Sequence, residues 1–429
     1  MWPIIISSSI FVICLVLIFS EKLNRTITSM IGAVLMVVFG IVFHFYNDEQ
    51  VLGSVDFNTL GLLLGMMILV SVLEPTGFFQ YLAVRVGKLS KGKPVRMLLF
   101  LGAITTIVSM FLDNVTTVVL IAPVTILLCE ILGISSQPFL LAEALLSNTG
   151  GVATLVGDPP NILIGSAAGL TFLDFLTHSM PIVLIVWVAA LLILLFLFRK
   201  ELAQKPSDLD ALMDLNPDDV LKDPKSIRKI IIVIFCMIAL FLLEDVFHIE
   251  PSLVALGGAS VALVWIRPSI QETLKRVQWD ILIFFGALFI MIGGMEGAGV
   301  FDRLTNFAVL IKDIQPVLMG LIILWSVAFL SMIVDNVPIT IALIPVIHGL
   351  GVAGIPTGPL WWALVFGAGF GGNGTIIGST ANIVVASLSD KTRNPITPKV
   401  WNKKGLPVMI GTTLVASICY LIFFGLISK

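Results

Sequence analysis

The chain has 429 residues, of which 58% are hydrophobic and 12% are charged, and its formal net charge is −2. A soluble domain carries about 25% charged residues, so this composition excludes one. The near-neutral charge gives no reason to expect a nucleic-acid partner. The four cysteines are far apart in sequence and have no metal-ligand spacing, so they predict small buried side chains.

Apolar runs recur along the chain, many of them long enough to cross a bilayer, and they predict a polytopic helical membrane protein. In the first half they lie at 3–20, 28–45, 60–73, 95–112, 115–132, 139–176 and 180–198. The first run lacks a basic flank and a cleavage site, so we interpret it as a retained span. In the second half the runs lie at 229–243, 251–266, 281–295, 316–334, 337–350, 360–388 and 406–427.

Two stretches of the chain repeat each other. The segment from Met110 to Pro123 places Asp113-Asn114 between two apolar runs, and the segment from Met332 to Pro345 repeats this arrangement with Asp335-Asn336, 222 positions later. The glycine-rich segment 150–161 matches 371–382 with an offset of 221. The chain is therefore expected to be a tandem duplication.

The duplication predicts an all-α polytopic membrane protein with two inverted-topology repeats, each with about five spans and one re-entrant hairpin. The first membrane repeat covers 1–198, a polar cytosolic linker covers 199–228, and the second membrane repeat covers 229–429. With the amino terminus outside, every basic residue except Arg303, Lys312 and Lys429 falls in an inner loop. This orientation makes the hairpin near 95–132 open inward and the hairpin near 316–350 open outward.

An Asp at membrane depth costs about 2.5–3.5 kcal/mol on insertion scales, so a duplicated pair indicates function. We predict that Asp113 and Asp335 couple protons or cations. Helix breaks at membrane depth are tolerated where they line a cavity or are covered by protein, so we expect one central polar site. Its predicted substrate-binding residues are Asn114, Thr116, Thr117, Asn336, Asn148, Thr149, Gly150, Gly151, Asn161, Gly371, Gly372, Asn373, Thr375 and Asn382.

Structural roles for the acidic residues remain open alternatives. Asp113 and Asp335 could be interfacial helix N-caps, because Asp is a good N-cap. Glu74 and Glu296 could simply end a span at an interface. Glu143 could face the site or pair with an inner arginine. The hydroxyls of Thr116 and Thr117 have no counterparts in the second repeat, so we expect the first hairpin to contribute more to solute binding.

These hairpin and glycine motifs resemble those of the ion transporter superfamily, in the branch that contains arsenite efflux permeases, sodium/proton antiporters and the melanosomal P protein. The resemblance implies an inverted-repeat transporter, usually a homodimer, whose transport domain moves against a scaffold. In the citrate and dicarboxylate relatives each hairpin tip reads Ser-Asn-Thr and helps to bind sodium and substrate carboxylate. Here Asp113-Asn114-Val115 and Asp335-Asn336-Val337 occupy those places.

Two acidic tips would repel a di- or tricarboxylate and suit a cation, a proton or a neutral solute. Together with the resemblance to arsenite permeases, this charge favours proton-coupled efflux of arsenite, antimonite or a similar metalloid across the cell inner (plasma) membrane. Sodium/proton antiport, or transport of a carboxylate or other anion, is the alternative. A channel is a further alternative, and so is a membrane subunit that works with a separate soluble ATPase, since the chain has no Walker motif of its own. No catalytic residues, metal ligands or cofactor are expected, so the chain is not expected to be an enzyme.

Overall fold

The computed structural model describes residues 2–19, 23–207, 209–301, 303 and 314–427, and all regular elements among them are helices. Seven of the helices in these ranges are long and apolar enough to cross a membrane, and further apolar helices are shorter. The expected all-α polytopic class is confirmed. Of the basic residues used to orient the chain, Lys22, Lys312 and Lys429 lie outside the described residues.

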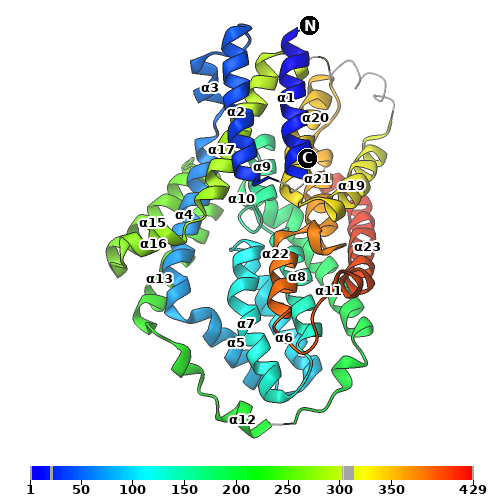
Figure 1. Cartoon of the computed structure of the whole chain (residues 1–429). Coiled ribbons are helices and arrows are strands. Elements are labelled where there is room, and N and C mark those ends of the chain that lie inside the picture. Colours follow the sequence, from blue (N-terminus) through cyan, green and yellow to red (C-terminus); the bar gives the residue numbers. More distant parts are fainter. Residues whose placement is uncertain (1, 20–22, 208, 302, 304–313, 428–429) are drawn as a thin grey trace.

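The first group of helices, which we call the frame, lies along the top and left of Figure 1. Within it, α2 packs on α17 and α4 packs on α15. Each of these pairs joins one helix from the first repeat to one from the second. The frame consists of α1 (Trp2–Phe19), α2 (Arg25–Val42), α3 (Asp48–Ser54), α4 (Phe57–Leu73), α13 (Pro224–Leu242), α14 (Glu244–Phe247), α15 (Pro251–Ile266), α16 (Ile270–Arg276) and α17 (Trp279–Gly297).

The second group, the hairpin bundle, lies at the lower centre and right of Figure 1. Its arms pack in matching pairs, α6 on α8 and α19 on α21. The bundle consists of α5 (Phe78–Leu89), α6 (Pro94–Ser109), α7 (Asn114–Leu132), α8 (Gln137–Gly151), α9 (Pro159–Ala168), α10 (Phe172–Asp174), α11 (Met180–Leu197), α19 (Pro316–Ile333), α20 (Asn336–Val352), α21 (Gly358–Gly371), α22 (Thr380–Ser389), α23 (Pro398–Ile422) and α24 (Phe424–Ile427).

The helices follow the sequence repeat closely. α3 and α16, α4 and α17, α6 and α19, and α7 and α20 each begin 222 positions apart. Each half holds one hairpin and one broken helix, which are α6–α7 with α8–α9 in the first half and α19–α20 with α21–α22 in the second. The fold therefore consists of the two inverted-topology repeats that the sequence predicts.

Several short helices were not predicted from the hydropathy pattern, and α5 and α3 are two of them. α5 lies in the stretch that was expected to be an inner loop, because Arg85 and Lys88 fall within it. Only one of its faces is apolar, with Phe79, Ala83 and Val86 buried, so its sequence does not indicate a membrane-spanning helix. α3 is a shorter helix with no buried residue.

The linker, residues 199–228, contacts the bundle through hydrogen bonds. Lys88 Nζ donates to the carbonyl oxygens of Met213 at 2.7 Å and Leu215 at 2.6 Å. The Ser207 N–H donates to Leu132 O at 2.9 Å. The segment 199–228 contains the short helix α12 (Leu209–Asp214), and α13 begins inside it at Pro224.

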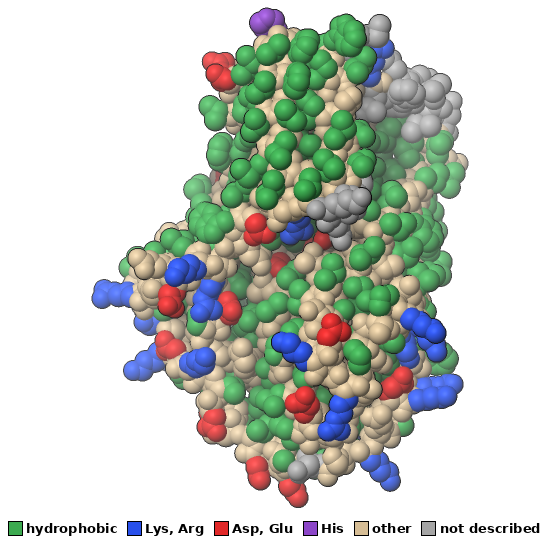
Figure 2. Space-filling view, viewed as in Figure 1, with side chains coloured by type: hydrophobic (Ala, Val, Ile, Leu, Met, Phe, Trp, Pro, Cys, Tyr) green, Lys and Arg blue, Asp and Glu red, His purple; other side chains and the backbone are tan. Residues whose placement is uncertain are grey.

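Hydrophobic side chains cover the upper part of the face shown in Figure 2, where α1 and α2 lie, and charged side chains gather lower down. On α2 the exposed large side chains include Ile31, Val34, Val38 and Val42. A helix this apolar on its outer face fits contact with lipid.

Candidate functional site

The first hairpin tip is the short non-helical link between α6 and α7. Its Asp113 is the N-cap of α7, and the carboxylate accepts hydrogen bonds from the Thr116 N–H at 2.8 Å and from Thr116 Oγ1 at 2.5 Å. Such bonds satisfy amides that a helix start leaves unpaired. Asp113 is therefore a helix cap, but it also lines a cavity.

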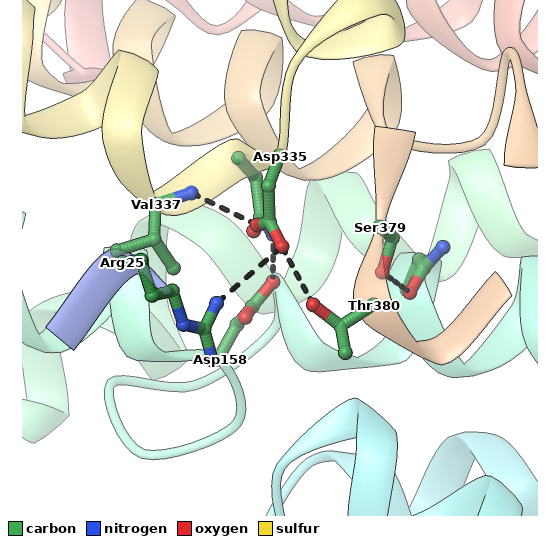
Figure 3. Close-up of polar contacts among 8 residues, drawn as sticks. Arg25, Asp158, Asp335, Val337, Ser379 and Thr380 are labelled. Atoms are coloured by element: carbon green, nitrogen blue, oxygen red, sulfur yellow. Dashed lines mark hydrogen bonds and ion pairs between the residues drawn. The ribbon is translucent and has the colours of Figure 1, made fainter. Parts of the chain in front are cut away.

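The second tip is built from different partners (Figure 3). Asp335 caps α20 and accepts from Thr380 Oγ1 of α22 at 2.6 Å. The position that matches Thr116 is Pro338, which has no donor, so the hydroxyl comes from another helix. Arg25 Nη1 lies 3.7 Å from Asp335 Oδ2. The two repeated acids therefore each have a hydroxyl partner, while a cation contacts the second.

Asp158 joins the two tips. The amides of Asn114 and Asn336 both donate to its Oδ2, at 3.1 Å and 2.9 Å. Asp158 lies in the break between α8 and α9 and is only 4% exposed. One buried carboxylate thus holds the tips of two hairpins that are more than two hundred residues apart in sequence.

Sequence reasoning missed Asp158 as a site residue, although a signal was available. It is an ionisable residue inside an apolar run, which is the criterion that selected Asp113 and Asp335. Its counterpart in the second repeat is Ser379, so this acid is not duplicated and the repeat does not single it out. Arg25 was also missed, because it was assigned to an inner loop.

A small cavity of about 50 Å³ lies where the tips meet the frame. Arg25 is the only basic residue among the described residues that line it. The lining consists of Arg25, Asp113, Asn114, Val115, Asp158, Pro159, Ile281, Phe284, Phe285, Asp335, Asn336, Val337, Ser379 and Thr380. In the described part of the chain no three His, Cys, Asp or Glu side chains are arranged to hold a metal ion.

A larger cavity of about 180 Å³ shares Asp113, Val115, Pro159 and Ile281 with the first one. Thr116 lines it on the bundle side. On the frame side Glu74 Oε1 pairs with Arg276 Nη1 at 3.3 Å. Glu74 therefore lines a cavity beside the first tip as well as ending α4.

The breaks of α8 and α21 are closed by one asparagine each, in the same way. Asn161 Nδ2 donates to Gly151 O and Thr154 O, both at 2.8 Å. Asn382 Nδ2 donates to Gly372 O at 2.7 Å and Thr375 O at 2.9 Å. These bonds satisfy carbonyls that the interrupted helices leave free.

Of the predicted site residues, Asp113, Asn114, Thr116, Asp335 and Asn336 line the cavities. The others lie behind them in the bundle and do not line either cavity. These residues are Thr117, Asn148, Thr149, Gly150, Gly151, Asn161, Gly371, Gly372, Asn373, Thr375 and Asn382. Thr117 is fully buried, and its hydroxyl has no hydrogen-bond partner among the described residues, so only one of the two extra hydroxyls of the first hairpin faces the cavity.

Asn148 links the two repeats behind the cavity. Its Nδ2 donates to Asn373 Oδ1 at 3.0 Å and to Asn382 Oδ1 at 2.9 Å, while its Oδ1 accepts from Ser379 Oγ at 3.1 Å. Because Ser379 and its neighbour Thr380 begin α22, this network fixes the helix that supplies the hydroxyl to Asp335. Asn148 therefore supports the site from behind.

The glycines of the breaks allow the backbone to approach the hairpins. A Cβ on Gly151 would lie 2.6 Å from Asn114 Oδ1, and one on Gly371 would lie 2.5 Å from Ala328 O. Both distances are shorter than any normal contact of a Cβ. Each broken helix can therefore sit against its hairpin only with glycine at these places.

Glu143 lies apart from both cavities. It is fully buried, its Oε1 accepts from Thr125 Oγ1, and its Oε2 has no hydrogen-bond partner among the described residues. It forms no ion pair with an arginine in the described chain, so neither of the two expected roles is observed.

Two inverted membrane repeats, with paired hairpin tips that meet broken helices around a polar centre, define a membrane transporter. The sequence model of the family described as "Citrate transporter" (CitMHS) matches residues 15–367. The chain belongs to this family.

Several relatives match over nearly the whole chain. The "46 kDa membrane protein" of Mycobacterium leprae is 39% identical over 422 residues, which cover 96% of this chain and 97% of the relative. An "uncharacterized transporter" of Synechocystis is 31% identical, covering 97% of this chain and 96% of the relative. The human P protein is 30% identical over 95% of this chain, which matches 58% of the length of that protein.

Among solved structures, the YdaH transporter of Alcanivorax borkumensis is similar in fold. The TM-score is 0.66, the sequence identity is 14%, and the match covers 90% of this chain and 89% of that one. This likeness shows a shared fold.

Proposed function

We propose that this transporter exports a small uncharged oxyacid, such as arsenous or antimonous acid, in exchange for protons. One observation carries the proposal. Three carboxylates, those of Asp113, Asp158 and Asp335, line a cavity of about 50 Å³ in which Arg25 is the only basic residue among the described lining residues.

The charge of the cavity argues against a tricarboxylate substrate. Two unit charges of like sign about 4 Å apart repel by about 4 kcal/mol at an effective dielectric constant of 20. A citrate trianion would meet such repulsion from more than one of the lining acids, and Arg25 could balance only one of them. A neutral solute or a cation meets no such barrier.

The tips carry groups that suit a neutral polyhydroxy acid. Thr116 and Thr380 place hydroxyls at the two tip carboxylates, and these carboxylates can accept hydrogen bonds from a solute. A carboxylate that binds a proton on one side of the membrane and releases it on the other would couple the export to the proton gradient. Asp113 suits this role, because no basic residue contacts it among the described ones.

Sodium/proton antiport is a second candidate, and the chemistry of the cavity lining favours it. Carboxylate and hydroxyl oxygens are hard ligands that suit a small cation. In this case Asp113 would bind sodium and protons in turn.

The cellular setting completes the proposal. We infer that the chain works as a homodimer in the inner (plasma) membrane, with the linker in the cytosol, the first hairpin opening inward and the second opening outward. A separate soluble ATPase partner is compatible with these features. The membrane-facing apolar surface over α1 and α2 and the bias of basic residues support this arrangement.

Transport into everted membrane vesicles tests both candidates. Vesicles that contain the wild type, Asp113→Asn or Asp223→Asn are loaded with a pH-reporting dye and given arsenite, sodium chloride or citrate. Asp223 also caps a helix, α13, but is not among the residues that line either cavity, so it is the matched control.

We expect arsenite accumulation that needs a proton gradient, that is lost in Asp113→Asn and that is kept in Asp223→Asn. A pH change evoked by sodium without arsenite uptake would favour antiport instead. Citrate uptake by the wild type would refute both candidates.

A further inference from the structure

Arg25 is a frame residue that reaches into the small cavity. We propose that it determines specificity as a tethered counter-cation, because it neutralises Asp335 and leaves Asp113 as the tip that is open to a transported cation. This inference rests on the proposed function in one respect, namely that tip carboxylates bind the coupling cation. It adds that the two repeated tips have different tasks.

The ion pair between Arg25 and Asp335 is partly shielded from solvent. The side chains are 31% and 17% exposed, and Arg25 Nη1 lies 3.7 Å from Asp335 Oδ2 (Figure 3). The guanidinium also lies over the ring of Phe284 of α17, 5.7 Å from its centroid, within the range of a cation–π interaction. A pair that is partly removed from water is screened less than a surface pair, so it competes effectively with a free cation.

The position of Arg25 in its own helix is unfavourable. It is the first residue of α2, where the positive end of the helix dipole disfavours a cation. The helix start is nevertheless fixed, because Asn24 caps it and Thr26 Oγ1 donates to Asp280 O of α17 at 3.1 Å. The frame therefore holds a cation at this point against the local preference of the helix, and Asp335 offsets that cost.

The arrangement breaks the symmetry of the repeats. In the second repeat the helix that matches α2 is α15, and its first residue is Pro251, which carries no charge. The other arginine at the described cavities, Arg276, is paired with Glu74 rather than with Asp113. The carboxylate of Asp113 accepts from the N–H and the hydroxyl of Thr116, and no basic side chain among the described residues forms an ion pair with it. One tip acid is thus matched by an internal cation and the other is not.

The pair also spans the two groups of helices. Arg25 lies on α2 of the frame, and Asp335 lies at the start of α20 of the hairpin bundle. A cation that binds to Asp335 must displace Arg25, whereas one that binds to Asp113 displaces no basic residue. The chain should therefore have one strong cation site.

Thermal unfolding of the purified full-length protein tests this directly. The midpoint is measured against sodium chloride, with choline chloride keeping the ionic strength constant. Arg25→Gln should bind sodium at least about tenfold more tightly than the wild type, because the Asp335 carboxylate loses its ion-pair partner and becomes free to bind the cation. Arg25→Lys should resemble the wild type, and Arg25→Gln with Asp335→Asn should lose the gain.

Arg276→Gln is the matched control, because it removes an equal charge from the neighbouring cavity. An equal gain in this variant, or none in Arg25→Gln, would overturn the proposal. If Arg25→Gln does not fold, adding Asp335→Asn should restore folding, and failure to do so would also count against it. These readouts need neither arsenite nor a proton gradient, so their outcome is separate from that of the proposed function.

Discussion

Replacing Asp158 tests whether one carboxylate holds the two hairpin tips together. In Asp158→Ala the amides of Asn114 and Asn336 both lose their acceptor. A hydrogen bond to a charged group contributes about 1.5–3 kcal/mol, so the two bonds together give a loss of about 3–6 kcal/mol. This is an upper bound, because removing the charge also relieves repulsion from Asp113 and Asp335.

Asp158→Asn separates the bonds from the charge. Its amide oxygen can still accept from both asparagines, so this variant should lose no more than about half as much stability as Asp158→Ala. Its transport should nevertheless fall, because one of the three cavity carboxylates is gone.

Equilibrium unfolding by denaturant in detergent micelles gives the stabilities, and the vesicle assay gives the transport. An Asp158→Ala protein as stable as the wild type would refute the linking role. An Asp158→Asn protein less stable than Asp158→Ala would show that the charge, and not the pair of hydrogen bonds, matters for folding.

Three further predictions concern the surroundings of the site. Gly151→Ala should displace Asn114 and reduce transport at least about tenfold. Gly257 has open space around it, so Gly257→Ala should leave transport unchanged and raise the stability of its helix by up to about 1 kcal/mol. Equal transport rates in the two variants would contradict this. Glu143→Gln should stay within about 1 kcal/mol of the wild type in the same unfolding assay, because its amide oxygen still accepts from Thr125, whereas Glu143→Ala should lose about 2–4 kcal/mol. The hydrogen bond from Ser226 lowers the pKa of Asp223 in the folded protein. The ionised Asp223 therefore contributes to stability above about pH 4, and this contribution is lost as the pH falls through the folded pKa. Asp223→Asn should therefore flatten the acid side of the stability curve, and an unchanged curve would show that the cap does not matter.

The repeat made much of the fold predictable. Matching apolar runs and matching breaks placed both hairpins and both interrupted helices, because glycine and proline disfavour a helix interior and Asp favours a helix start. α5 was not predicted, since a short helix with one apolar face gives a weak hydropathy signal. Arg25 was misplaced for a related reason, because a basic residue next to an apolar run usually marks a membrane surface.

The site was predictable where it is symmetric and unpredictable where it is not. Asp113 and Asp335 were found because the sequence repeats them, and both line the small cavity. Asp158 has Ser379 as its counterpart, Thr116 has Pro338, and Arg25 has Pro251, so these residues do not stand out when the two halves are compared. Which side chains face a cavity also depends on tertiary packing, which explains why Asn161 and Asn382 turn toward their own backbone instead.

The closure of each helix break by an asparagine of its own repeat has an evolutionary consequence. The bonds that the amide nitrogens of Asn161 and Asn382 donate run to carbonyls of their own repeat, so an ancestral single-repeat chain could already form this break. The bonds from Asn114 and Asn336 to Asp158 are different, because they need one acid between two tips. Two identical ancestral copies would have brought two such acids, or none, to the axis between them. The change that left Asp158 facing Ser379 therefore belongs to the period after duplication, when the two copies could diverge independently.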